Sequence, residues 1–218
     1  MATIVPFGLY DVDRYYLDEL RKADSHVPKS DYEDDGQHHR KFYCGPVYND
    51  KGINYFVPIS SKIKKQDYLE PYVRIMKNPE NKKEIGCLDF RYMVPVPSKY
   101  IAPHEDMDAE KRNFNGELSH TAIYARICNN TRARRKIHET AKAAFNDISD
   151  NKPIAKSSIA FGKMQRVVRQ VDRDIAQGKS QYKPDPFVTD LRTRFQNTIE
   201  GWSTPAVSTP PDTTPEIK

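Results

Sequence analysis

The sequence predicts an α+β fold built on an antiparallel sheet, and two observations support this. Strand-like runs separated by turn residues fill the first half of the 218-residue chain, and helical periodicities fill the second half. Only 37% of the residues are hydrophobic, while 13 are tyrosines, so we expect a modest core that amphipathic tyrosines extend.

The first expected elements are a strand and a helix. Residues 4–10 form a short apolar run suited to a strand. Asp11 or Asp13 then caps a helix. Four residues follow at helical spacing: Tyr16, Leu17, Leu20 and Ala23. The helix should end by residues 27–28, because a residue before proline disfavours the helical region. Residues 29–40 are polar and should form a loop.

The clearest local signal is a β-hairpin. Residues 41–48 and 53–60 are rich in strand-forming side chains, and the Asn-Asp-Lys-Gly sequence at 49–52 suits the connection. If the two residues that flank this connection pair with each other, Tyr43 lies opposite Pro58. By the same register Lys41 lies opposite Ser60.

A second antiparallel pair is expected further along. Residues 71–76 and 84–94 have strand character, and the turn residues at 78–81 separate them. Pro95 and Pro97 should close the last strand, because proline lacks the N–H that a ladder requires.

Helices should make up the rest of the domain. A polar loop at 102–116 precedes helical patterns at 118–129 and 132–148, the second of which is a separate helix or a continuation. Two further helices are predicted, at 158–176 and at 187–199.

We expect residues 1–201 to form one domain, with 175–201 as a helical extension, and residues 202–218 to form a disordered tail. From residue 203 onward the chain holds four Pro and six Ser or Thr, and such a stretch buries too little apolar surface to offset its ordering entropy. The tail carries a charge of −1 and the whole chain carries +5, so the folded part carries +6. This surplus permits a polyanionic partner without requiring one.

Several protein classes are excluded by simple patterns. No apolar run approaches the roughly 18 residues of a membrane span, and no basic segment precedes the first apolar run as in a signal peptide. The three cysteines lie far apart, so we expect neither disulfides nor a zinc site, and a cytoplasmic location. No motif for a metal, nucleotide or other cofactor occurs, and the clustered acids fit surface loops.

The residues best suited to chemistry lie at the end of the predicted hairpin. Ser60 and Ser61 are followed by Lys62 and Lys64, and strand periodicity would place Ser60, Lys62 and Lys64 on one face. Hydroxyl and ammonium groups can hold a phosphate and transfer protons. The register adds Lys41 and Tyr43, and a mixture of cations and aromatics suits single-stranded RNA. The alternative is an ordinary solvated strand end.

A second basic concentration occupies residues 126–136. It includes Arg132, Arg134 and Arg135, and Arg166 and Arg169 follow later. These arginines would track a phosphate backbone, or they form the solvated faces of helices.

Four stretches, in this order, resemble the ToxN/AbiQ family of type III toxin–antitoxin and abortive-infection toxins: LYDVDRYYLDELRKADSHVPK, RKFYCGPVYNDKGINYFVPISSKIKK, IGCLDFRYMVPVPSKYI and AIYARICNNTRARRKIHETAKAAF. The resemblance covers about residues 7–170. It implies a compact fold around a twisted antiparallel sheet flanked by helices. It also implies an endoribonuclease that cuts cellular or phage mRNA without a metal or other cofactor.

In such toxins the 2′-hydroxyl attacks the adjacent phosphorus and leaves a 2′,3′-cyclic phosphate. The resemblance further implies a partner, a small antitoxin RNA made from tandem repeats. The toxin trims this RNA from a precursor, and the RNA then occupies the active-site groove in a closed protein–RNA hetero-oligomer. No membrane is involved.

The family's motif residues match positions of this sequence. The strand lysine and the aromatic two positions later match Lys41 and Tyr43, and the hydroxyl pair matches Ser60 and Ser61. The aromatic of the first helix matches Tyr16. The family's key lysine falls at Ile63, so either Lys62 or Lys64 beside it takes that role.

We therefore expect Lys64 or Lys62 to act as general acid or base, helped by the pKa depression that neighbouring lysines cause. Ser60 and Ser61 would orient the phosphate, and Lys41 would stabilise its charge. Tyr16 or Tyr43 would stack on a base. Two alternatives remain: a non-catalytic RNA-binding module that uses the same basic, Tyr-rich surface, and an interaction protein whose tail docks a partner.

Overall fold

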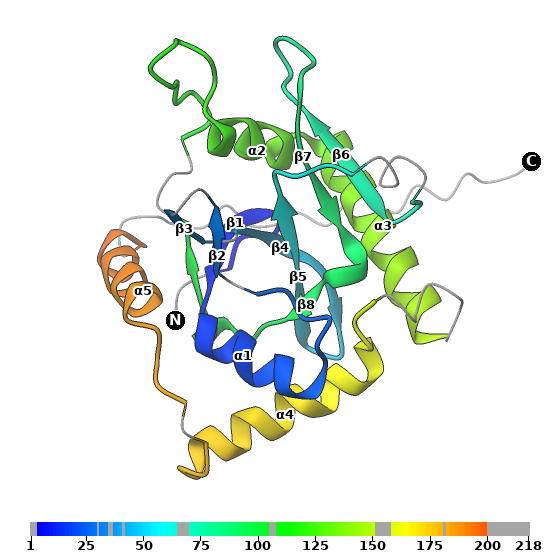
Figure 1. Ribbon diagram of the computed structural model, residues 1–218, viewed down its shortest axis with the longest axis vertical. Helices are drawn as coiled ribbons and strands as arrows, with labels where there is room; N and C mark the ends of the chain where they lie inside the picture. Colours follow the sequence, from blue (N-terminus) through cyan, green and yellow to red (C-terminus); the bar gives the residue numbers. More distant parts are fainter. Residues whose placement is uncertain are drawn as a thin grey trace, which may run out of the picture.

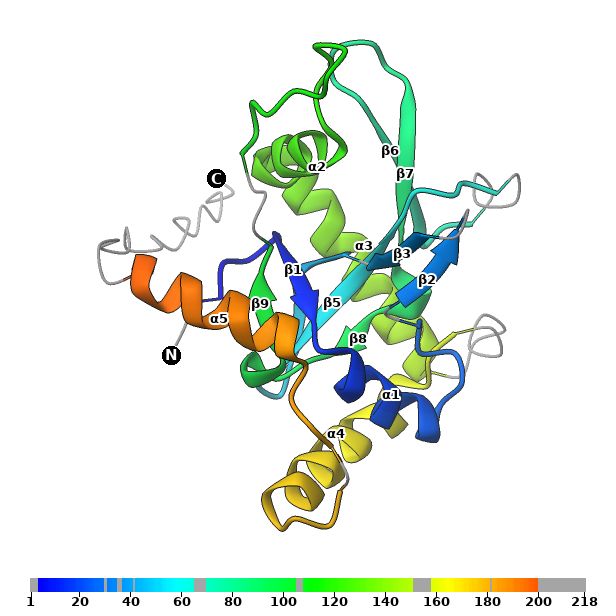
Figure 2. The ribbon, with the colours of Figure 1, turned by 60° about the vertical axis from the view of Figure 1, so that its left-hand side comes forward.

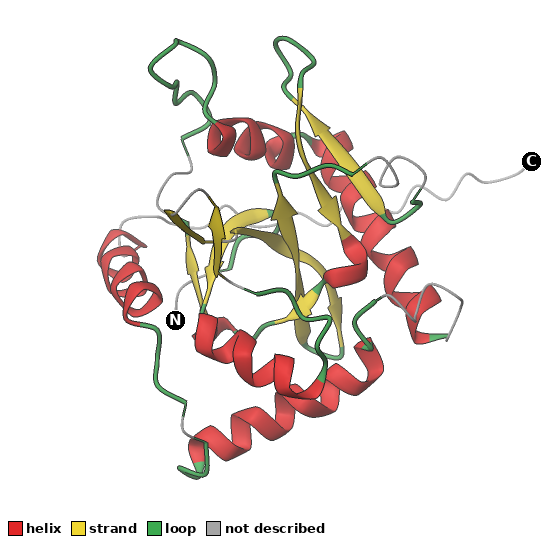
Figure 3. Cartoon of the chain, in the orientation of Figure 1, coloured by secondary structure: helices red, strands yellow, loops and turns green. Residues whose placement is uncertain are grey.

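The computed structural model of the protein describes residues 4–29, 31–34, 37–40, 42–64, 70–104, 108–150, 158–180 and 182–199. The expected disordered tail, residues 202–218, lies outside these ranges, as does Lys41. Within them, an open antiparallel sheet is surrounded by helices, so the α+β prediction is confirmed (Figures 1 and 3).

Seven strands form the sheet: β1 (Gly8–Val12), β4 (Phe42–Asp50), β5 (Ile53–Ser60), β6 (Val73–Lys77), β7 (Glu84–Asp89), β8 (Val94–Pro95) and β9 (Ile101–Pro103). The spatial order is β6-β7-β5-β4-β1-β9, and β8 also pairs with β5. All of the pairings are antiparallel. Two one-turn helices, η2 (Phe90–Tyr92) and η3 (Ser98–Tyr100), flank β8.

Five α-helices accompany the sheet: α1 (Arg14–Ala23), α2 (His120–Asn129), α3 (Thr131–Ser149), α4 (Phe161–Ala176) and α5 (Pro186–Ile199). Helices α1 and α4 pack together at one end, α2 and α3 cover the sheet elsewhere, and α5 lies along β9 (Figures 1 and 2). None of these helices is long and apolar enough to cross a membrane, as far as the described residues go.

The first helix begins where an acidic cap allows. Asp13, rather than Asp11, is the cap, because its Oδ1 accepts the N–H of Tyr16 at 3.0 Å. Asp11 instead belongs to β1, which is shifted toward the C-terminus of the predicted strand at 4–10. Two strand residues, Asp11 and Val12, therefore separate the predicted end of the strand from the Asp13 cap.

The β4–β5 hairpin confirms the strongest sequence signal with one adjustment. Tyr43 pairs with Pro58 as predicted, but near the turn Tyr48 pairs with Tyr55. A register shift between Cys44 and Tyr48 accounts for the difference. The turn itself is the two-residue Lys51-Gly52 step, and both residues have the positive φ values that such turns require.

Three other predictions need correction. The expected loop at 29–40 contains a two-stranded sheet of β2 (Asp31–Asp34) and β3 (Gln37–Arg40). The expected loop at 102–116 begins within β9. The long strand at 84–94 is interrupted by η2, because the Asp89 side chain accepts the N–H of Arg91 and ends the ladder. The helices at 118–129 and 132–148 are separate, since Asn130 caps α3 through its side chain.

The core is continuous from the sheet to the helices and contains many aromatic rings. Tyr55 packs edge-on against the rings of Phe145 and Phe161, whose centroids are 5.2 and 5.7 Å away. The three cysteines are buried. Cys44 on β4 and Cys128 on α2 have their sulfur atoms 3.5 Å apart, so α2 sits directly on the sheet.

Candidate active site

The predicted Ser-Ser-Lys cluster lies where β5 leaves the sheet. Ser60 is the last strand residue and pairs with Cys87 of β7. Its hydroxyl donates to the carbonyl of Lys62 at 3.1 Å and accepts the N–H of Lys62 at 3.3 Å. The strand therefore ends in a tight turn, and the period-2 argument that placed Ser60, Lys62 and Lys64 on one face fails beyond Ser60.

This turn divides the roles of the two serines. The Ser60 hydroxyl is occupied within the turn, whereas Ser61, Lys62 and Lys64 are exposed. We call residues 60–64 the β5 turn. It presents one hydroxyl and two ammonium groups to solvent within four residues, and these groups suit an anionic phosphate.

The β5 turn is held in place by a close approach from β7. An ideal Cβ on Gly86 would lie 2.3 Å from the carbonyl oxygen of Ser60 and 2.7 Å from the hydroxyl of Tyr124. A real Cβ does not fit in this space, so glycine is required at this position. The absence of a side chain at Gly86 thus lets β7 and α2 together fix where β5 ends.

The two predicted base-stacking tyrosines are core residues instead. Tyr16 and Tyr43 are both 0% exposed. Tyr16 stacks on Tyr100 with ring centroids 4.1 Å apart and donates to the carbonyl of Pro95 at 2.9 Å. Its complete burial raises the pKa of its hydroxyl. A ring without an exposed face cannot stack on a base, so the stacking role expected for Tyr16 or Tyr43 does not fit the fold.

The three predicted RNA-binding arginines of α3 differ in their surroundings. Arg134 donates to the carbonyl of Cys128 and to the side chain of Asn129, so it caps the end of α2. Arg135 pairs with Glu139 one turn later, with both side chains largely exposed. Arg132 is exposed in the first turn. Among the described residues, no hydrogen bond or ion pair connects these arginines to the β5 turn.

Beside the β5 turn lies a cavity that sequence reasoning missed. It has a volume of about 260 Å³, and we call it the loop cavity. Its polar wall combines Ser61 with residues far away in the sequence: Asn78, Asn81, Lys83, Asn113 and His120. No local pattern marks these positions, because they come together only when the β6–β7 turn, the loop before α2 and α2 itself meet.

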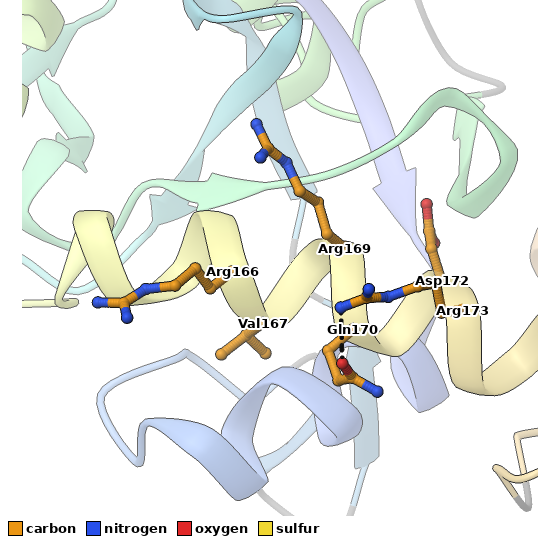
Figure 4. Close-up of a pocket in the computed structure, with 6 residues that line it drawn as sticks. All are labelled: Arg166, Val167, Arg169, Gln170, Asp172 and Arg173. Atoms are coloured by element: carbon orange, nitrogen blue, oxygen red, sulfur yellow. Dashed lines mark hydrogen bonds between the residues drawn. The ribbon is translucent and has the colours of Figure 1, made fainter.

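A larger concavity of about 820 Å³ lies along α4 (Figure 4). It is lined by Arg166, Arg169 and Arg173, and Arg173 donates to Gln170 of the same helix at 2.8 Å. Arg169 also borders a neighbouring cavity together with Lys51 and Gly52 of the β4–β5 turn. This basic face is therefore near the opposite end of β5 from the Ser60 turn.

Comparison with known proteins places these features in one family. The family model described as "Toxin ToxN, type III toxin-antitoxin system" matches residues 8–169. A curated relative, endoribonuclease ToxN of Bacillus thuringiensis subsp. kurstaki, is 38% identical over 90 residues, which are 41% of this chain and 43% of that protein. The aligned segment thus spans less than half of the relative's length.

The fold has a solved counterpart. The structure of AbiQ, described as a lactococcal anti-phage endoribonuclease belonging to the type III toxin–antitoxin system, superposes with a TM-score of 0.59 at 20% identity. The superposition covers 78% of this chain and 99% of AbiQ. At this level of identity the similarity establishes the fold.

Proposed function

This chain belongs to the ToxN family of type III toxin–antitoxin toxins, and on that basis we propose that it is an endoribonuclease that needs no metal ion. The β5 turn is the observation that carries the proposal. It places Ser61, Lys62 and Lys64 in solvent at a fixed strand end, next to the loop cavity. Hydroxyl and ammonium groups of this kind supply both phosphate binding and proton transfer.

The reaction we propose is attack by the 2′-hydroxyl on the adjacent phosphorus. A base takes the 2′ proton as the O2′–P bond forms, and an acid protonates the 5′ oxygen as the P–O5′ bond breaks. The products are a 2′,3′-cyclic phosphate and a 5′-hydroxyl. Lys62 or Lys64 serves as the acid or base, Ser61 binds the phosphate, and Lys41 neutralises it.

The role of Ser60 changes in this proposal. Because its hydroxyl holds the turn through Lys62, Ser60 acts as a positioning residue, and Ser61 is the hydroxyl that meets the phosphate. A Ser60→Ala variant would then lower the cleavage rate by loosening the turn.

We propose a small, folded, repeat-derived RNA as the partner that silences the enzyme, in a closed protein–RNA hetero-oligomer. Cellular or phage mRNA would be the substrate, and abortive infection the outcome. The net charge of +5 supports a polyanionic partner, as do the exposed Arg132 and the arginines of α4.

Cleavage of a long unstructured RNA in EDTA tests the proposal. The wild-type protein should produce fragments with 2′,3′-cyclic phosphate ends. The Lys62→Ala/Lys64→Ala double variant should cut at least about 100-fold more slowly, because general acid–base catalysis typically contributes 10²–10⁴-fold. The two single variants identify which lysine carries the proton.

Lys51→Ala provides the matched control. Lys51 is an exposed lysine in the turn at the other end of β5, a strand that spans roughly 23 Å from Ile53 to Ser60 at the usual rise per residue. This variant should cut at the wild-type rate. A double variant that also cuts at the wild-type rate would remove the lysines from the mechanism. Wild-type protein that binds RNA but leaves it intact would instead identify a non-catalytic RNA-binding module.

A further inference from the structure

The loop cavity is built by three segments that ion pairs fasten to one another. Arg112, in the loop before α2, contacts Glu80 of the β6–β7 turn at 3.0 Å. Arg126 of α2 contacts the same Glu80 at 3.4 Å and also pairs with Glu110. The two loops project from the same end of the molecule in both views (Figures 1 and 2). These contacts connect the three segments that line the cavity.

Three asparagines line the loop cavity, and their side chains form hydrogen bonds in the same way. Each uses its side-chain oxygen inside a turn: Asn78 accepts the N–H of Glu80, Asn81 that of Lys83, and Asn113 those of Asn115 and Glu117. Among the described residues, none of the three amide NH2 groups donates a hydrogen bond. The turns fix these side chains, so their donors are oriented in advance.

Other lining groups extend the range of hydrogen bonds. Lys83 and His120 add a cation and an imidazole, and Glu117 adds a carboxylate acceptor. Within the described part of the chain, neither Lys83 nor Glu117 forms an ion pair through its side chain. A second carboxylate in the lining, Glu84, pairs with Lys77 at 3.2 Å. Donors and acceptors around a single cavity match the mixed edge of a nucleobase, which itself carries both.

An aromatic residue lies beside this wall. Phe114 directly follows Asn113 and is fully exposed, with a relative exposure of 104%. A phenylalanine in this position gains nothing for the fold, since it contacts no core. Exposed aromatic rings next to basic and amide groups are how proteins stack single-stranded RNA bases.

We propose that the loop cavity binds one nucleobase of the RNA next to the scissile phosphate. Asn81 and Asn113 read the edge of that base, and Phe114 stacks on the adjoining base. The inference rests on the proposed function, because Ser61 belongs both to the cavity wall and to the β5 turn. The volume of about 260 Å³ lies just below the roughly 300–1,000 Å³ of drug-sized ligand sites, so it suits one ring system.

Isosteric substitutions test this subsite without disturbing the turns. Asn81→Asp and Asn113→Asp keep the oxygen that each turn uses and remove the NH2 donor. Asn115→Asp, two residues away in the same loop, makes the charge change of either single substitution outside the cavity wall. A random pool of 2′-O-methyl heptanucleotides, which cannot be cut by 2′-hydroxyl attack, is offered to each protein, and the bound fraction is sequenced.

The wild-type protein and Asn115→Asp should enrich one base at one position. The Asn81→Asp/Asn113→Asp double variant should lose that enrichment, by about 2- to 13-fold for each hydrogen bond removed. Phe114→Ala should weaken binding of the pool about 5- to 150-fold, as removal of one stacking ring does. Enrichment that survives in the double variant, or that is absent in the wild type, would overturn the subsite.

The same proteins are then assayed on unmodified RNA, which separates this inference from the proposed function. Base enrichment without cleavage by the wild type would refute the endoribonuclease and retain the subsite. Cleavage at unchanged sites by the double variant would refute the subsite and retain the endoribonuclease.

Discussion

Replacing Gly86 by alanine should damage both the stability of the protein and the β5 turn. The added Cβ would lie 2.3 Å from the carbonyl oxygen of Ser60, and the φ of +156° at Gly86 is unfavourable for alanine. Forcing a methyl group into a packed interior costs about 1–3 kcal/mol, and here the obstacle is backbone that both β5 and β7 hold. We expect a loss near 3 kcal/mol, which for a domain of this size lowers Tm by about 6–12 °C.

Gly162→Ala is the matched control for the same chemical change. Gly162 is an exposed residue in the first turn of α4, and an added Cβ there meets nothing within 4 Å. Alanine is the better helix former, so this variant should gain about 0.5–1 kcal/mol. Urea unfolding followed by circular dichroism measures both variants.

The activity assay adds a second readout. Because Gly86 lies against Ser60, the folded fraction of Gly86→Ala should cut RNA more slowly than wild-type protein, whereas Gly162→Ala should cut at the wild-type rate. Gly162→Ala should gain stability in the same unfolding experiments. If the unfolding free energy of Gly86→Ala then lies within 0.5 kcal/mol of the wild-type value, β7 can move away from β5 at no cost, and the reasoning is refuted.

Two further predictions concern the contacts that join the C-terminal helices to α1. Burial raises the pKa of Asp24, but hydrogen bonds from the N–H of Ala160 and from His26 lower it overall. The stability that these bonds supply is therefore present above pH 4 and lost as the pH falls further. Asp24→Asn should lose about 0.5–1.5 kcal/mol of unfolding free energy at pH 7. The urea midpoint of this variant should vary less between pH 5 and 3 than that of the wild-type protein. Tyr182 donates a hydrogen bond to the buried carboxylate of Asp13. Tyr182→Phe should lower the free energy of urea unfolding by about 1.5–3 kcal/mol. A loss below 0.5 kcal/mol would show that water replaces the bond.

The local elements of this fold were predictable because their signals are local. The hairpin connection at 49–52 and the acidic cap at 11 or 13 were both expected, and each depends on residues a few positions apart. The β2–β3 pair has such a signal too, in the Asp35-Gly36 dipeptide between its strands, but the polarity of the segment outweighed it. Turn residues are better evidence than hydropathy for short exposed strands.

The candidate site was predictable only in part, for a physical reason. Ser60, Ser61, Lys62 and Lys64 are adjacent in sequence, so composition reveals them. Asn81, Asn113 and His120 reach Ser61 only through tertiary packing, and no periodicity encodes that packing. Tyrosine is ambiguous by nature, since its ring suits a core and its hydroxyl suits water. Tyr16 shares the helical spacing of Leu17 and Leu20 and took its stacking role from the resemblance alone; the fold buries both Tyr16 and Tyr43.

Helix α5 protects an edge of the sheet from aggregation between molecules of this protein. It lies beyond the residues that match the family and buries Val188 and Leu191 against Ala102 of β9, the last strand of the open sheet. Terminal strands with uncovered backbone groups invite strand addition from a second chain. A protein shortened before α5 would leave that strand uncovered, and its failure in the cell would take the form of aggregation rather than lost chemistry.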